Sequence, residues 1–535
     1  MRFLFTIAMT LLLYGCYKNE SVITDTLIYC SEAYPQSFNS QISHDISTLD
    51  ATTHQLYNRL VKFDASGESF IPDLATHWQQ SDDKLSFTFF LRKNVNFQHT
   101  DYFTPTRFFN ADDVIFSFQR MLEINTPYNS INRAGDSYFY NHPFTNLVAD
   151  VIKIDDYTVK FILNEPDVTL LANLAAHYGV IISKQYGEKL LSIGHPEKID
   201  YYPIGTGPYQ FKNANKRTGI IRYNAHPQYW GVRPSIKNLI FEVTTNKTKR
   251  HSKLLSGECD IITYPEPSQL DKMAANPKIK LHRTATDNLA LWSFNTVAAQ
   301  FNNKNIRQAF SYAIDQKTII EAIFFQSGNA TSSLLAEQSW AYNPKRITLQ
   351  YNPQLALEML KNNNFDFNKT ITILTSIENS VFNPNFHKTA ELIQINLFDI
   401  GIKSEIISLL PAALEKRLAS GHYDTYLTGI NMPMNDPDSL FRPLLSCDAT
   451  VAEGNSSQWC SKRVQTLLDS ALLESNFIKR IMSYYKLQEI TQQDRPYYPI
   501  AHVLRVDASN QNISGLRVDP LTGIDFQYIR KTEVN

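Results

Sequence analysis

Short runs of apolar and β-branched residues along the chain predict strands. They lie at residues 26–30 (TLIYC), 85–91 (LSFTFFL) and 157–163 (YTVKFIL), and apolar and polar positions alternate in the last of them. Residues 207–223 place a polar turn ending at Gly219 between two β-rich arms, as in a hairpin. The pattern therefore predicts sheet segments joined by short turns.

A helical period appears further along the chain, at residues 303–324. Ile306, Phe310, Ala313 and Ile314 recur on one face, after an asparagine pair able to cap the start. This spacing predicts one amphipathic helix. Because strand and helix patterns stay interspersed throughout, without an internal repeat, we expect an α/β fold with several lobes.

Length and composition narrow the class of protein. A chain of 535 residues with 43% apolar residues is too long for one core and is expected to form two or three lobes. The formal net charge is -1, with 51 basic and 52 acidic residues, so the basic excess typical of a nucleic-acid-binding surface is missing. Nucleic acid is therefore not an expected partner.

The amino terminus reads MRFLFTIAMTLLLYGC, an apolar run after one arginine that is too short to span a bilayer. It predicts a secretory signal over residues 1–16. Leu13, Tyr14, Gly15 and Cys16 also resemble a bacterial lipobox, which would make Cys16 a lipidated amino terminus. Ordinary cleavage nearby, with loss of Cys16, is the alternative.

The chain has five cysteines, none at the two-residue spacing of zinc or thioredoxin-like sites, so no metal site is expected. Without Cys16, four remain in an oxidising compartment, where an even count favours disulfides. A bond between Cys447 and Cys460 would close a short loop and contribute about 3 kcal/mol. We interpret this stretch as a covalent staple.

Catalytic and nucleotide-binding motifs are missing from the sequence. It contains no G-x-S-x-G elbow, no H-E-x-x-H helix, no phosphate loop and no G-x-G-x-x-G fingerprint. We therefore expect a protein that is not an enzyme and requires no cofactor. A transport role would need a partner that hydrolyses ATP.

Several separated stretches carry a resemblance to a known family. They include LYNRLVKF (56–63), NADDVIFSF (110–118), PIGTGPYQF (203–211), GECDI (257–261) and NIRQAFSYAID (305–315). In this order they resemble the periplasmic solute-binding proteins, family 5, that supply dipeptides and oligopeptides to ABC transporters. The stretch NDPDSLFRPLLSC is most similar to the subfamily that serves the Sap antimicrobial-peptide transporters.

The resemblance implies a two-lobed periplasmic-binding-protein type II fold with an extra inserted subdomain, known as cluster C. Lobe I would cover residues 25–286, with the insertion at about 57–205, and would be completed by residues 504–535. Lobe II would cover residues 287–503.

The resemblance also implies two disulfides, Cys30 with Cys259 and Cys447 with Cys460, leaving Cys16 for lipid.

Alignment with the family places two sets of ligand contacts. In lobe I they are the segment after the first strand, namely His44, Asp45, Ile46 and Ser47. Asp45 would meet a cationic group of the ligand, although a solvated loop carboxylate is the alternative. An aromatic-lined ligand space with His44 nearby would also be compatible with haem.

In lobe II the resemblance points to Asn288 and Trp292 on a strand, and to Asp436 and Asp438 around Pro437. A core tryptophan and an ordinary Asp-Pro-Asp turn are the alternatives.

The sequence departs from the dipeptide-binding pattern at two positions. Thr428-Gly429 is followed by Ile430 where relatives place an aspartate that binds the ligand ammonium. Lys388 stands where relatives have an arginine, whose bidentate geometry a lysine does not reproduce. We therefore expect a ligand that is larger than a dipeptide or differently charged.

These observations favour a monomeric peptide-binding protein in the periplasm of a Gram-negative bacterium. Its ligands would include cationic antimicrobial peptides, and its partner would be an inner-membrane ABC permease. Haem carried as cargo is the alternative within the same family. A secreted peptide hydrolase is the alternative from a different class.

Overall fold

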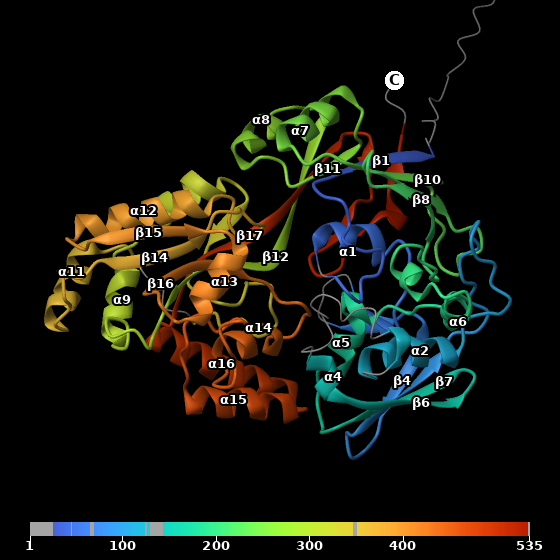
Figure 1. Cartoon of the computed structure of the whole chain (residues 1–535), viewed down its shortest axis with the longest axis horizontal. Helices are drawn as coiled ribbons and strands as arrows, with labels where there is room; N and C mark the ends of the chain where they lie inside the picture. Colours follow the sequence, from blue (N-terminus) through green and yellow to red (C-terminus); the bar gives the residue numbers. More distant parts are fainter. Residues whose placement is uncertain are drawn as a thin grey trace, which may run out of the picture.

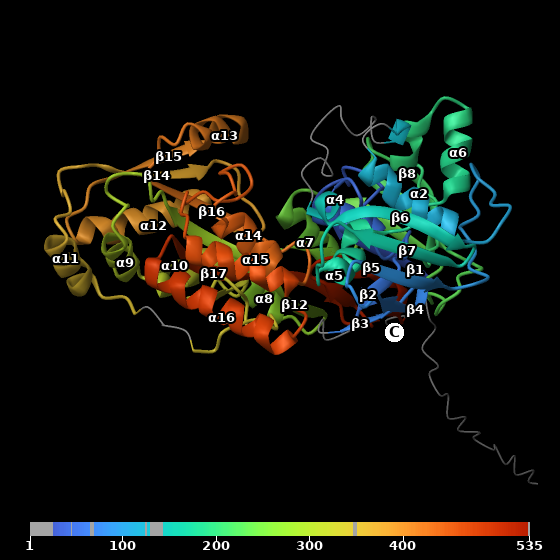
Figure 2. The same cartoon turned by 90° about the horizontal axis from the view of Figure 1, so that it is seen from below.

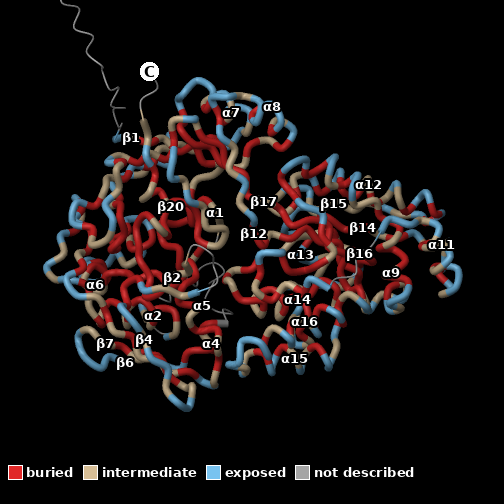
Figure 3. Tube along the Cα trace, turned by 180° about the vertical axis from the view of Figure 1, so that it is seen from behind, coloured by how far each residue is buried: buried red, intermediate tan, exposed pale blue. Residues whose placement is uncertain are grey.

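The computed structural model describes residues 25–43, 45–64, 69–123, 126–128, 143–345 and 350–532. These residues form two lobes that lie side by side, with the inserted subdomain below lobe I in the first view (Figures 1 and 2). Buried residues run through the interior of both lobes, and the exposed residues lie mainly on outer helices and loops (Figure 3). Across the described ranges, none of the helices combines the length and the apolar composition needed to span a membrane.

One sheet passes through both lobes. Its order is β15-β14-β16-β12-β17-β11-β1-β10-β9-β8, and β13 also pairs with β17. β1 is parallel to β10 and β11, and β14 is parallel to β15 and β16. The strands are β1 (Thr26–Ser31), β8 (Tyr209–Asn215), β9 (Ile220–Ala225), β10 (Asn238–Val243), β11 (Ile261–Thr263), β12 (Ile279–Phe294), β13 (Gly328–Ala330), β14 (Ile371–Ser376), β15 (Ser404–Leu409), β16 (Thr425–Ile430) and β17 (Tyr497–Asn510).

The chain crosses between the lobes twice, along the two longest strands. β12 and β17 are antiparallel partners from Ile279 to Ala285 in lobe I and again from Leu289 to Ser293 in lobe II. The register shifts between Ala285 and Leu289, so the pairing is interrupted where the chain leaves lobe I. A bulge of this kind bends the strand and re-aims its side chains.

Lobe I and the inserted subdomain share one hydrophobic core, which includes residues of β1, β10 and of the sheet β4-β5-β7-β6. Four short strands close the chain in lobe I: β18 (Ile513–Ser514), β19 (Arg517–Asp519), β20 (Gly523–Asp525) and β21 (Arg530–Lys531). The other elements here are α1 (Ile46–Thr52), β2 (Val61–Phe63), β3 (Phe70–Pro72), β4 (Ala75–Gln80), β5 (Ser86–Leu91), α2 (Ala111–Leu122), α4 (Pro143–Leu147), β6 (Val148–Asp155), β7 (Thr158–Leu163), α5 (Leu170–Ala175), α6 (Lys184–Ser192), α7 (Lys247–Ser256) and α8 (Leu270–Ala274).

Lobe II packs helices on both faces of its part of the sheet. Alternate residues of β12 enter two different cores: Trp292 and Phe294 join one cluster, and Leu289 and Leu291 join another. This follows from the two-residue period of a strand. The first cluster contains α9 (Lys304–Tyr312), α11 (Pro353–Asn362) and α12 (Phe386–Asp399), and the second contains α14 (Asp438–Leu445), α15 (Lys462–Leu473) and α16 (Phe477–Asp494); α10 (Gln316–Ile319) and α13 (Pro411–Ala419) complete the lobe.

The local predictions agree with most of these elements. β1, β5 and β7 form where the strands were expected, and β8 and β9 form the hairpin, with Gly219 at a φ of +71°. Glycine suits this left-handed conformation because it has no Cβ. Asn303 caps α9 by accepting a hydrogen bond from the Asn305 N–H.

The single helix predicted over residues 303–324 is wrong. α9 ends at Tyr312, α10 begins at Gln316, and Ile320–Phe324 form a π-helical turn. Asp315 causes the break because its side chain caps α10 through the Thr318 N–H, and its own N–H donates to Asn396 Oδ1 at 2.9 Å. A cap residue inside an apolar period therefore ends one helix and begins the next.

Two disulfides are present, and their pairing confirms the prediction. Cys30–Cys259 ties β1 to the segment before β11, over a sequence separation of 229 residues. Cys447–Cys460 closes the loop between α14 and α15, over a separation of 13 residues.

A buried ionic network joins β17, α1 and β1 in lobe I. Arg505 Nη1 and Nη2 donate to Asp50 Oδ1 and Oδ2 at 3.0 and 2.7 Å, and Arg505 Nε donates to Asp507 at 3.0 Å. The Tyr29 hydroxyl and the Ile524 N–H also donate to Asp50, at 2.6 and 2.9 Å. The Arg505 and Asp50 side chains are each 1% exposed, so solvent does not screen their attraction.

Replacing Arg505 with methionine should lower the free energy of unfolding by about 3–5 kcal/mol, because Asp50 and Asp507 would then be buried without a cation. Chemical denaturation of the disulfide-bonded protein measures this loss. Lys212→Met is the matched control: it breaks the exposed ion pair with Asp101 and should cost less than about 1 kcal/mol. Equal losses in the two variants would contradict the importance of the buried network.

Candidate functional site

The expected ligand segment of lobe I lies at the start of α1. Asp45 caps this helix: its Oδ1 accepts a hydrogen bond from the Thr48 N–H at 3.0 Å. Ile46 is half-buried, and Ser47 is buried with its hydroxyl 3.4 Å from Glu32 Oε1. His44 lies outside the described residues. The Asp45 carboxylate therefore already has a structural role.

The two residues expected on β12 lie in different environments. Asn288 is half-buried next to the register shift, and its N–H donates to Thr286 Oγ1 at 3.0 Å. Trp292 is fully buried in the core of lobe II, with its ring centroid 4.8 Å from that of Phe294 and 6.1 Å from that of Phe310. The strand period directs the indole into this helix-covered core, so it does not reach a ligand-facing surface.

The two aspartates around Pro437 each have an arginine partner. Arg480 Nη1 and Nη2 donate to Asp436 at 2.6 and 2.8 Å, and Arg442 Nε and Nη2 donate to Asp438 at 2.9 and 3.0 Å. Burial raises the pKa of Asp438 to about 6, against the opposing effect of Arg442. Asp436 therefore holds the loop before α14 against α16, and the Asp438 pair with Arg442 lies within α14, so neither carboxylate stands open for a ligand cation.

Lys388 lies in the first turn of α12, on the surface of lobe II. Its side chain is 54% exposed, and Nζ is 2.8 Å from Glu391 Oε2. This ion pair with Glu391 on the same helix is the only contact of Nζ within the described residues.

The lobes contact one another through the inserted subdomain, at positions that the sequence did not reveal. The Val168 N–H donates to the Leu472 carbonyl at 3.3 Å, and Lys84 Nζ donates to Ser475 Oγ at 2.7 Å. Met434, from the loop before α14, packs into the core of lobe I. Asp436 and Arg480 act electrostatically on Asp167, whose pKa is raised chiefly by burial.

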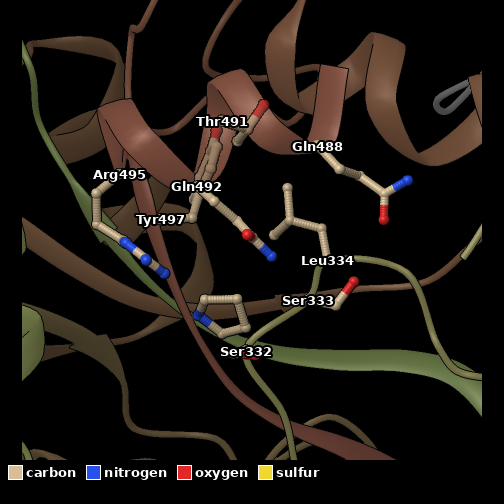
Figure 4. Close-up of a pocket in the computed structure, with 9 residues that line it drawn as sticks. Ser332, Ser333, Leu334, Gln488, Thr491, Gln492, Arg495 and Tyr497 are labelled. Carbon is tan, nitrogen blue, oxygen red and sulfur yellow. The ribbon is translucent and has the colours of Figure 1, made fainter. Parts of the chain in front are cut away.

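A small cavity lies inside lobe II, lined by residues 332–334, the end of α16 and the start of β17 (Figure 4). Its volume is about 20 Å³, enough for one water molecule. It is too small for a peptide.

Two α/β lobes joined by a pair of long strands, with further contacts where the inserted subdomain meets lobe II, are the architecture of proteins that bind a solute by hinge motion. A family model described as bacterial extracellular solute-binding proteins, family 5, matches residues 69–451. The chain belongs to this family.

Curated relatives match nearly the whole chain. The probable ABC transporter periplasmic-binding protein SapA of Escherichia coli is 35% identical over 93% of this chain and 91% of its own length. The dipeptide-binding protein of Escherichia coli is 34% identical over 95% of both chains. Heme-binding protein A of Haemophilus influenzae is 34% identical over 95% of this chain and 92% of its own length.

Solved structures have the same fold. HbpA2 from Haemophilus parasuis aligns with a TM-score of 0.87 and 33% identity, over 95% of this chain and 100% of that one. The dipeptide-binding protein from Pseudoalteromonas sp. SM9913, in complex with Met-Leu, aligns with a TM-score of 0.82 and 35% identity, over the same shares. The two-lobed type II fold expected from the sequence is confirmed.

Replacing Trp292 with alanine should lower the free energy of unfolding by about 3–5 kcal/mol, because it leaves a cavity in the core of lobe II. Chemical denaturation measures the loss. Tyr351→Ala, which truncates an aromatic side chain that is 44% exposed, is the control and should be nearly neutral. A fully stable Trp292→Ala protein would mean that the indole is not a core residue.

Proposed function

We propose that this chain is the extracytoplasmic binding component of an ABC transporter, which holds a peptide between its lobes and delivers it to an inner-membrane permease. The observation that carries the proposal is the pair of lobes joined by the long strands β12 and β17, in a fold shared at 35% identity with a dipeptide-binding protein in complex with Met-Leu. The names of the SapA and dipeptide-binding relatives support it.

Closure would follow from ligand contact with both lobes. A ligand shifts the open and closed populations only by its difference in affinity for the two states. The contacts of Val168 with Leu472 and of Lys84 with Ser475 form at the edge where the lobes meet. They close the lobes opposite the crossing strands, so a bound peptide would be held inside.

The ligand is proposed to be longer than a dipeptide or to carry additional positive charge, as cationic antimicrobial peptides do. Ile430 cannot bind an ammonium, and Lys388 is engaged with Glu391. Phe382 lies over Gly429, within 2.2 Å of where a Cβ would stand, so the strand end before Ile430 is covered. The positions at which relatives bind the ammonium and the carboxylate of a dipeptide are therefore occupied by different residues in this chain.

Haem is the second candidate, because Heme-binding protein A is 34% identical to this chain. Titration with haemin tests it through the Soret band. A shifted, saturable band would favour haem, and an unchanged band at high protein concentration would remove that candidate.

Small-angle X-ray scattering with calorimetry tests the peptide proposal. The protein without its signal segment should become more compact on adding a lysine-rich amphipathic peptide of about 20 residues, and Met-Leu should bind more weakly or not at all. Compaction is expected because the lobes close only around a ligand that contacts both of them. A profile that stays unchanged with the long peptide, Met-Leu and haemin, with no heat of binding, would refute a binding-protein role.

A crosslink between the lobes gives an independent test of closure. Val168→Cys with Leu472→Cys should form a third disulfide, since the backbones of these residues are hydrogen-bonded. Release of a fluorescent lysine-rich peptide trapped before oxidation should slow by at least about tenfold, because opening is blocked. Each single-cysteine variant is a control, and equal release rates would show that the ligand leaves without separation of these edges.

A further inference from the structure

Asp287 lies on β12 at the point where the chain passes between the lobes. It falls inside the register shift between Ala285 and Leu289. The backbone around it is fixed, because Thr286 Oγ1 donates to the Val503 carbonyl at 2.6 Å and Gln338 Nε2 donates to the Thr286 carbonyl at 3.1 Å. The Asp287 residue is only 9% exposed.

The Asp287 carboxylate has no hydrogen-bond donor and no cation among the described residues. Other buried aspartates differ: Asp50 pairs with Arg505, Asp436 with Arg480 and Asp260 with Lys531. Burying a carboxylate without such a partner is costly, so a proton or a cation from outside the chain would stabilise it.

The charged group that acts electrostatically on Asp287 is another carboxylate, Asp519, the last residue of β19 in lobe I. The pKa of Asp287 is raised to about 7, chiefly by burial and secondly by the negative charge of Asp519. Asp519 is held in place because its Oδ1 accepts hydrogen bonds from the Leu521 and Thr522 N–H groups, at 2.8 and 3.1 Å. The Arg59 guanidinium interacts electrostatically with Asp519 and Asp525, but it does not contribute to the pKa shift of Asp287.

We propose that Asp287 and Asp519 together bind a positively charged group of the ligand, an ammonium or a guanidinium. The inference rests on the proposed function and specifies its ligand class. Two carboxylates are too few for a calcium ion, which takes six to eight oxygen ligands. An organic cation needs only such a pair, and its charge would relieve their repulsion.

The position of the pair links recognition to closure. Asp287 is carried by the strand that crosses between the lobes, and Asp519 belongs to lobe I. A ligand cation between them would stabilise the arrangement in which Asp287 is buried and Asp519 half-buried. Asp287 on β12 would thus take the role of the aspartate that relatives have after the position of Gly429.

The test compares two tripeptides of equal size, Ala-Lys-Ala and Ala-norleucine-Ala, by calorimetry at pH 8. The wild-type protein should bind the lysine peptide at least tenfold more tightly. Asp287→Asn should bring this ratio close to one without weakening binding of the norleucine peptide, and Asp519→Asn should reduce it. Asp525→Asn, in the same hairpin, is the matched control and should keep the ratio.

N-acetylated versions of both peptides separate the side-chain ammonium from the α-ammonium as the bound group. A preference for the lysine peptide that survives acetylation assigns the side-chain ammonium, and a preference that acetylation removes would overturn that assignment. Folding is checked by thermal melting. Asp287 has a raised pKa in the folded protein, so its ionisation opposes folding above pH 7, and Asp287→Asn should melt no lower than wild type at pH 8.

The outcomes separate this inference from the proposed function. If the wild type binds both tripeptides but Asp287→Asn changes neither the lysine preference nor the effect of acetylation, the inference is overturned and the peptide-binding role stands. If neither the tripeptides nor the longer lysine-rich peptide binds, the proposed function itself fails.

Discussion

The pairing of β12 with β17 is the constraint on which both lobes depend. These strands supply adjacent positions in the sheet on each side of the crossing, and they contribute residues to both cores of lobe II and to a smaller cluster in lobe I. Arg505 extends this dependence, since it joins β17 to α1 through Asp50 inside lobe I. Between the two paired regions, the register shifts from Ala285 to Leu289, where the chain passes between the lobes.

Several buried carboxylates of this protein are paired with a cation, whereas Asp287 is not. Buried carboxylates on α1 and on the loop before α14 are matched by arginines, which makes them structural rather than available to a ligand. Asp287 lies in the crossing without such a partner. Family membership gives the general role of the chain, and this uncompensated charge gives a physical reason for preferring one class of ligand within that role.

The sequence predicted features whose cause is local. The β8–β9 hairpin depends on its turn and on Gly219, and the Asn303 cap depends on neighbouring residues. The pairing of the disulfides came from the family resemblance. Contacts between distant residues were not predicted: Asp436 and Arg480 are 44 positions apart, and nothing in either segment signals the pair. Likewise, the side of the sheet that receives Trp292 depends on the register of β12.

The order of the chain has a consequence for how lobe I is made. Asp50 is among the early residues, but its cation, Arg505, and the Ile524 N–H that it accepts come from the last part of the sequence. The buried network of lobe I is therefore complete only when residues from both ends of the chain have come together. A chain that stopped before Arg505 would leave Asp50 without its cation.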